Sequence, residues 1–173
     1  MGSNKIGSLH HRVQTALFAT AKVKVRFVPY KGTGAVVKDV IGNHLPIGLA
    51  QPGKWLPQMK VGLARVLLML DNERLEHPAF KDIPTPGELG YKFKIPVQFH
   101  GFMARKGTPP DRIKKIQKAF KKVLSTKPYK AFLKRQPHVR TAYRDDIKGM
   151  NADFAKSIVE ARAFMVKHKI LKK

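Results

Sequence analysis

The alternation of apolar and polar residues divides the N-terminal part of the chain into a helix and a strand. Apolar residues at helical spacing predict a helix over about Ser8 to Ala21, with Val13, Ala16 and Leu17 on one face. From Val23 to Phe27 apolar residues alternate with basic ones, which predicts a half-buried strand. The chain therefore begins with a helix that is followed by a strand.

The same order recurs further along. A glycine-flanked segment predicts a second helix over Ala35 to Ile41, and Leu45 to Ala50 reads as a short apolar strand. A short helix is expected over Lys54 to Lys60, and the Val and Leu content of Leu63 to Leu70 predicts a strand buried on both faces. This αβαβ order predicts the α/β class, with a mixed sheet flanked by helices.

The middle of the chain is rich in proline and glycine. We expect Asp71 to Tyr91 to be mostly loop around one helical turn near Thr85 to Leu89. Val97 to Ala104 predicts a further strand, and residues 105–107 a turn that leaves it.

The remainder is predicted to be helical. Thr108 is the expected N-cap of the next helix, with Pro109 at the first helical position and Asp111 at the capping-box position. Helices are expected over about Pro109 to Leu124, Pro128 to Gln136 and Asp145 to Lys167. The predicted division is an α/β domain over residues 1–95, a crossing strand and hinge over 96–107, and a helical segment over 108–173.

Composition restricts the class of protein. A chain of 173 residues with 43% hydrophobic content can bury the core of one domain. The absence of cysteine excludes disulfides, thiolate metal sites and cysteine nucleophiles, and leaves the compartment open. The sequence has no apolar run near the roughly 20 residues that span a bilayer and no signal-peptide pattern. Met1 to Ser3 are open to interpretation as a cloning remnant.

The charge is unusual. The chain has 35 Lys and Arg residues against 11 Asp and Glu, a formal net charge of +24, which attracts polyanions of many kinds. This leaves two interpretations of the predicted helix after residue 108: a solvated face, or a nonspecific surface for nucleic acid, acidic protein or anionic lipid that lacks base-stacking aromatics. Its basic residues are Arg112, Lys114, Lys115, Lys118, Lys121 and Lys122.

Two turns are candidates for holding a small anion. At Gly7-Ser8 the chain supplies a flexible turn and a hydroxyl at the expected N-cap, so the first N–H groups of the helix point outward with the positive end of the dipole. Tyr30, Lys31 and Gly32 end the predicted strand, where loops of α/β sheets meet ligands. The alternatives are an ordinary capped helix and a turn with a surface lysine.

Metal and catalytic chemistry find little support. His10 and His11 are adjacent, so a helix points them about 100° apart, and neither has a partner ligand one turn away. The pair Asp145-Asp146 is typical of a helix start. We therefore expect no metal, no cofactor and no enzymatic activity.

Taken in order, several segments resemble the second half of the solute receptors of tripartite tricarboxylate transporters, the Bug-type periplasmic binding proteins. The matching segments cover most of the chain, from about Asn4 to Ile170. They are Gly7 to His11, Val28 to Gly32, Gly42 to Gly48, Asp82 to Tyr91 and Gly101 to Pro109.

The resemblance implies a solute-binding function. Such receptors have two α/β lobes that clamp an organic acid without converting it; here the first lobe is largely missing and the terminal helices would pack on it. Implied partners are a di- or tricarboxylate or an aromatic acid, the membrane subunits of a transporter and, through exposed terminal helices, a second copy; the implied compartment is the periplasm. The ligand-binding residues that the resemblance implies are Asn4, Gly7, Ser8, His11, Tyr30, Lys31, Gly32 and Ala50.

Overall fold

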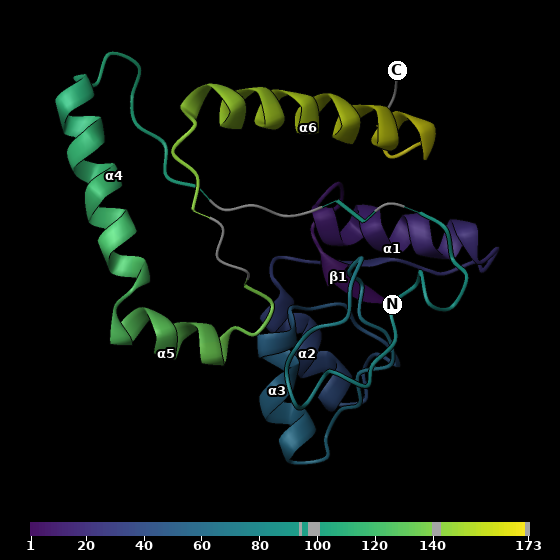
Figure 1. Cartoon of the computed structure of the whole chain (residues 1–173). Helices are drawn as coiled ribbons and strands as arrows, with labels where there is room; N and C mark the ends of the chain where they lie inside the picture. Colours follow the sequence, from purple (N-terminus) through teal and green to yellow (C-terminus); the bar gives the residue numbers. More distant parts are fainter. Residues whose placement is uncertain (94, 97–100, 140–142, 172–173) are drawn as a thin grey trace.

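The computed structural model describes residues 1–93, 95–96, 101–139 and 143–171, and combines a small parallel sheet with six helices (Figure 1). The N-terminal elements form an α/β unit, and the last three helices extend away from it (Figure 1). In chain order the elements are β1 (Gly2–Asn4), α1 (Leu9–Thr20), β2 (Val28–Tyr30), α2 (Thr33–Ile41), α3 (Pro52–Lys60), α4 (Pro110–Leu124), α5 (Lys127–Arg135) and α6 (Ile147–Lys167).

The first residues of the chain form the central strand, although sequence analysis assigned no element to them. β1 pairs in parallel with β2, with Gly2 opposite Val28. On its other side Gly2 forms a parallel bridge with Gly48. Ser3 is fully buried. Three apolar-poor residues carry no alternation that sequence analysis could detect, which is why this strand was not predicted.

The predicted strand over Val23 to Phe27 is also wrong. Val23 and Val25 are exposed, and regular pairing begins only at Val28, opposite β1. The strand predicted over Leu45 to Ala50 is reduced to the bridge at Gly48. Pairing is short because β1, the shared partner, is itself only 3 residues long.

Of the two helices that follow β2, α2 packs on both strands of the sheet and α3 packs on α2. One core cluster joins Val37, Ala50 and Trp55. A second joins Met69, Leu75 and Phe80 under the proline-rich loop, so this loop supplies core residues of its own.

Residues 63–70 are extended but form no regular strand, and the expectation of burial on both faces is wrong. Val66 packs against both core clusters, whereas the Leu67 side chain is 61% exposed. Leu63 is exposed in the same way. The segment alternates in burial because α3 and the loop cover only one of its faces.

The helical turn predicted near Thr85 is confirmed. The Leu89 N–H donates to the Pro86 carbonyl at 3.2 Å, and the Thr85 N–H donates to Glu88 Oε2 at 2.8 Å. Arg74 Nε donates to the other carboxylate oxygen at 2.7 Å. These bonds lower the pKa of Glu88, first through the Thr85 backbone N–H and then through Arg74.

The C-terminal helices have the predicted order. The N-cap of α4 is Pro109, not Thr108, whose hydroxyl donates to the Arg105 carbonyl at 2.7 Å instead. Residues 97–100 of the predicted strand lie outside the described residues; residues 101–104 form no strand, and Phe102 is 85% exposed. The proposed division at residues 95 and 107 stays a prediction.

None of the described residues of α4, α5 or α6 is buried. Apolar side chains on these helices, such as Ile116, Phe154 and Ile158, are therefore exposed. In the part of the chain that the structure describes, no helix is both long and apolar enough to cross a membrane.

Candidate anion-binding site

Three strand-to-helix connections meet at one edge of the sheet. β1 and β2 run parallel, and Gly48 bridges β1 in the same direction. Their carboxyl ends therefore lie together, and each leads within a few residues into α1, α2 or α3. We call this the carboxyl edge. Helix N-termini carry partial positive charge, so an edge that collects three of them favours an anion.

At the start of α1 the polar groups are largely used within the turn itself. Ser8 is the N-cap, as predicted, and its Oγ accepts from the His11 N–H at 3.2 Å. The Gly7 N–H donates to His11 Nδ1 at 2.9 Å, and Gly7 has a φ of +76°, which favours glycine. Asn4 Oδ1 accepts from the Lys5 N–H at 2.9 Å. These hydrogen bonds occupy polar groups of the turn, so the start of α1 offers few free donors to a ligand.

The start of α2 is more open. Gly32 is the N-cap in an extended conformation, and no side chain caps the helix. A Cβ on Gly32 or Gly34 would have no described neighbour within 4 Å, so the space beside the first turn is free. The exposed Lys31 side chain precedes this turn. The N-terminal amides of α2 are therefore the best placed donors at the carboxyl edge.

A polar pair joins α2 to α3 at the same edge. Thr33 Oγ1 donates to Gln51 Oε1 at 2.8 Å, and Thr33 is buried. Sequence analysis missed both residues; the only available signal was their position at the starts of two helices. Ala50, predicted from the resemblance, contributes its side chain to the core beside Trp55, which leaves its backbone at the edge.

Tyr30 lies at the end of β2, but its hydroxyl points elsewhere. It donates to Asp39 in the last turn of α2, remote from the helix N-terminus. This hydrogen bond, together with burial and the carboxylate charge, raises the pKa of Tyr30. The Tyr30 backbone remains at the carboxyl edge, whereas its hydroxyl holds α2 against the strand.

The histidines of α1 are held in a poorly solvated environment. Burial lowers the pKa of His10 and of His11, and the His11 ring stacks on Phe27 at 4.1 Å between centroids. Among the described residues no group of His, Cys, Asp and Glu side chains is assembled that could hold a metal ion.

The basic residues singled out on the fourth helix share one property: all are exposed along α4. Lys121 also lies over the Tyr143 ring at 5.8 Å from its centroid. They are apart from the carboxyl edge and form a separate surface. That this surface binds polyanions stays a prediction. The residues are Arg112, Lys114, Lys115, Lys118, Lys121 and Lys122.

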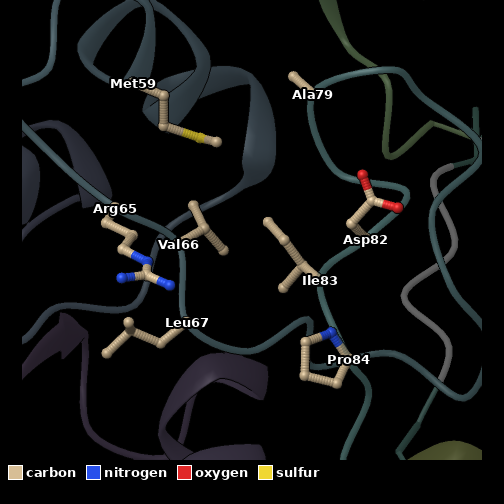
Figure 2. A pocket seen from close by; sticks show the side chains of 8 residues that line it. All are labelled: Met59, Arg65, Val66, Leu67, Ala79, Asp82, Ile83 and Pro84. Carbon is tan, nitrogen blue, oxygen red and sulfur yellow. The ribbon is translucent and has the colours of Figure 1, made fainter.

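A shallow pocket lies at the opposite end of α3. Its volume is about 340 Å³, and Figure 2 shows Val66 and Ile83 facing each other across it, with Met59 at the end of the helix. Arg65 and Asp82 stand at its margins (Figure 2). The pocket is apart from the starts of α1, α2 and α3, and it is not part of the carboxyl edge.

Comparison with known proteins identifies the fold. A crystal structure of a TctC solute-binding protein from Polaromonas, without ligand, superposes with a TM-score of 0.64 at 20% sequence identity, over 96% of this chain and 57% of that chain. This confirms the α/β class with a periplasmic-binding-protein-like lobe and C-terminal helices. The match thus leaves part of the Polaromonas chain uncovered.

Curated proteins show the same relation. Protein BugT of Bordetella pertussis is 28% identical over 151 residues, which cover 87% of this chain and 46% of that protein. A UPF0065 protein encoded in the gbd 5′ region of Cupriavidus necator is 29% identical over 123 residues, or 71% of this chain and 36% of that protein. The chain thus spans less than half the length of these relatives.

The family model named tripartite tricarboxylate transporter family receptor matches residues 1–165. This match covers nearly the whole chain and confirms the resemblance that the turn and strand motifs indicated. The protein therefore belongs to the family of tripartite tricarboxylate transporter receptors.

Proposed function

We propose that this chain is a solute-binding module that holds a small organic acid at the carboxyl edge, for delivery to the membrane subunits of a transporter in the periplasm. The observation that carries the proposal is the uncapped start of α2, with free space at Gly32 and Gly34 and Lys31 beside it. Membership of a receptor family supports a ligand that is bound and released without covalent change.

The chemistry of the edge favours a carboxylate. Its two oxygens can accept from adjacent backbone amides of the first turn of α2, as anions do at helix N-termini. The first turn of α2 contains no acidic residue, so nothing there repels a negative charge. Thr33 and Gln51 offer neutral polar atoms beside the amides, which suits a second polar group on the same ligand.

The proposal is tested by titrating the protein with succinate, citrate and benzoate, one acid from each candidate class. Calorimetry measures affinity, and amide NMR shifts locate the ligand. We expect the largest shifts at Gly32, Thr33 and Gly34. No shift with any of the three acids, in a protein shown to be folded, would contradict the proposal.

Two charge variants of α2 provide a matched comparison. Lys31→Gln removes the ammonium before the helix start, whereas Lys38→Gln removes an exposed ammonium in its last turn. Lys31→Gln is expected to weaken binding about fivefold, because a charge pair about 4 Å apart in water contributes about 1 kcal/mol. Equal weakening by Lys38→Gln would show that only the net charge matters.

A further inference from the structure

The extended segment after α3 has an unpaired backbone edge at residues 64–68, which we call the docking edge. The N–H and C=O groups of these residues form no hydrogen bond with any described residue. On one side of this stretch the Leu63 N–H donates to the Gln58 carbonyl at 2.9 Å, and on the other the Met69 N–H donates to the Pro84 carbonyl at 2.9 Å. The segment is thus held at both ends and open between them, whereas backbone groups of a folded chain are mostly paired.

The side chains of this segment alternate as they do in a strand. Arg65 and Leu67 are exposed, whereas Val66 between them packs against both core clusters. A period of two residues places Val66 on one face and its neighbours on the other, so the unpaired backbone groups lie along the edge between the two faces. A row of unpaired N–H and C=O groups of this kind is a template for another strand.

The pocket of about 340 Å³ adjoins the docking edge on its covered face. Val66 faces Ile83 across the pocket, and Figure 2 shows Met59 and Pro84 at opposite ends of it. These four side chains are apolar. A strand paired with the docking edge would place every second side chain on the same face as Val66, so one of them would lie over the pocket. The pocket therefore suits an apolar side chain of an added strand.

Two unpaired charges flank this pocket. Arg65 and Asp82 line its margins, and neither forms an ion pair or a hydrogen bond in the described part of the chain. Residues 58–70 contain two basic residues, Lys60 and Arg65, and no acidic one. Opposite charges on facing positions of paired strands attract each other, so an acidic residue opposite Arg65 would be stabilised.

A second copy of this chain fits the docking edge poorly. Each copy carries a formal net charge of +24, and two such copies repel each other. Residues 61–70 of a copy would also bring no acid to face Arg65, because this segment contains none. An acidic segment of another protein is complementary in charge on both counts.

We propose that the docking edge binds an extended, acidic segment of another protein. The segment adds as a strand to residues 64–68, places an apolar side chain in the pocket and places an acidic residue opposite Arg65. In this mode of recognition main-chain hydrogen bonds supply affinity, and pockets for alternate side chains supply specificity. The docking edge is separate from the carboxyl edge, so this inference does not depend on anion binding there.

The proposal is tested with the synthetic peptide Thr-Thr-Glu-Leu-Val-Thr-Thr, blocked at both ends, which we call the parent peptide. It offers an acidic residue beside an apolar one in a sequence that can extend. Amide NMR titration is expected to shift residues 64–68 and Ile83 most and to leave Gly32 and Thr33 unchanged. Absence of binding by the parent peptide to the folded protein would overturn the proposal.

Two N-methylated peptides test strand pairing on the unmodified protein. One carries the methyl group on the leucine nitrogen, and the other carries methyl groups on the glutamate and valine nitrogens. Alternate N–H groups of an added strand point toward the protein and toward solvent, so one of the two peptides should bind as the parent does and the other at least about fivefold more weakly. All three peptides carry the same charge, so general attraction to a basic chain cannot separate them. Equal affinities of the two methylated peptides would refute strand addition.

Protein variants test the pocket. Ala79→Leu adds volume at an exposed position that lines the pocket and should weaken the parent peptide about tenfold. The matched control is Ala119→Leu, at an exposed position on α4, which should bind as the unmodified protein does. Equal weakening by both leucine variants would contradict the assignment of the pocket.

A third variant tests the charge at the docking edge. Arg65→Gln should weaken the parent peptide by about two- to fivefold, as expected for an exposed charge pair. It should leave unchanged the affinity of a peptide with glutamine in place of glutamate. If Arg65→Gln weakens both peptides equally, Arg65 does not face the acid and the proposed register fails.

Two further measurements distinguish this inference from its alternatives. Analytical ultracentrifugation is expected to give a monomer, whereas a dimer that Ala79→Leu converts to a monomer would assign the docking edge to a second copy and overturn the proposal. Succinate should bind equally well with and without the parent peptide. Succinate binding without peptide binding would overturn this inference alone, and peptide binding without succinate binding would support it while the anion site fails.

Discussion

Replacing Gly48 by alanine tests the tightest contact of the α/β unit. Gly48 bridges β1 and passes directly under α2. A Cβ at this position would lie 2.6 Å from Val36 Cγ1 and 2.8 Å from Val40 Cγ2, whereas real Cβ contacts essentially never fall below 3.0 Å. Val36 is fully buried, so it has no space into which to move.

The magnitude follows from two opposing effects. Overpacking a well-filled core costs about 1–3 kcal/mol, while replacing glycine reduces the entropy of the unfolded chain and contributes about 0.4–1 kcal/mol in the opposite direction. We therefore expect Gly48→Ala to lower the free energy of unfolding by about 1–2 kcal/mol. The clash outweighs the entropy gain because both contacting atoms belong to β-branched side chains with one preferred rotamer in a helix.

Urea denaturation measures this loss. The chain has 1 tryptophan, Trp55, which is buried and lies within 3.6 Å of the added Cβ, so its fluorescence reports on the same core. With a typical m-value of about 2 kcal/mol per molar urea, the midpoint should fall by about 0.5–1 M. The matched control is Gly34→Ala, which has no described neighbour within 4 Å and should leave the midpoint unchanged or slightly higher.

A double-mutant cycle tests the cause. If the clash with Val36 dominates, Val36→Ala should cost at least about 1 kcal/mol less in the Gly48→Ala background than in the unmodified protein. A Gly48→Ala midpoint equal to that of the unmodified protein, or additive effects of the two substitutions, would refute the packing argument.

Three further changes address the ends of helices and the loop. Ser8→Ala removes the N-cap of α1 and should lower the free energy of unfolding by about 1 kcal/mol in urea titrations; no loss would mean that the cap contributes nothing. Tyr30→Phe should reduce stability but leave succinate affinity unchanged in calorimetry, because the hydroxyl is held by Asp39; weakened binding would place the hydroxyl in the site. Glu88 has a lowered pKa, so its contribution to stability is present above its ordinary pKa of 4.5 and is lost as pH falls through its folded-state pKa. Glu88→Gln should therefore reduce the change in the urea midpoint between pH 5 and 3. An unchanged pH dependence of the midpoint would contradict the assignment.

Helix prediction succeeded where the signal was local. Ser8 as N-cap, the glycines around α2 and the apolar spacing of α6 each act through bonds within one or two turns. The N-cap of α4 was predicted at Thr108, one residue too early, because two consecutive prolines follow Thr108 and the second one begins the helix. Boundaries of this kind depend on backbone angles that a residue pattern does not specify.

The candidate site was predicted in outline but not in detail. The turns at Ser8 and Lys31 were found because hydroxyl, glycine and lysine residues mark helix starts and strand ends. The Thr33–Gln51 bond and the hydroxyl direction of Tyr30 were missed, because each depends on a partner brought close by packing. The same is true of Gln136, which reaches the start of α3 only through the path of the chain after α5.

By itself, the sequence determined the order of helices, the excess of positive charge and the motif order that led to the receptor family. Only the tertiary structure decided that Gly2 to Asn4 form the central strand, that the start of α2 stays open and that Gln136 lies beside the start of α3. The physical reason is range: a helix is stabilised by bonds between residues four apart, whereas strand pairing and helix-end contacts join residues whose proximity exists only once the chain has folded.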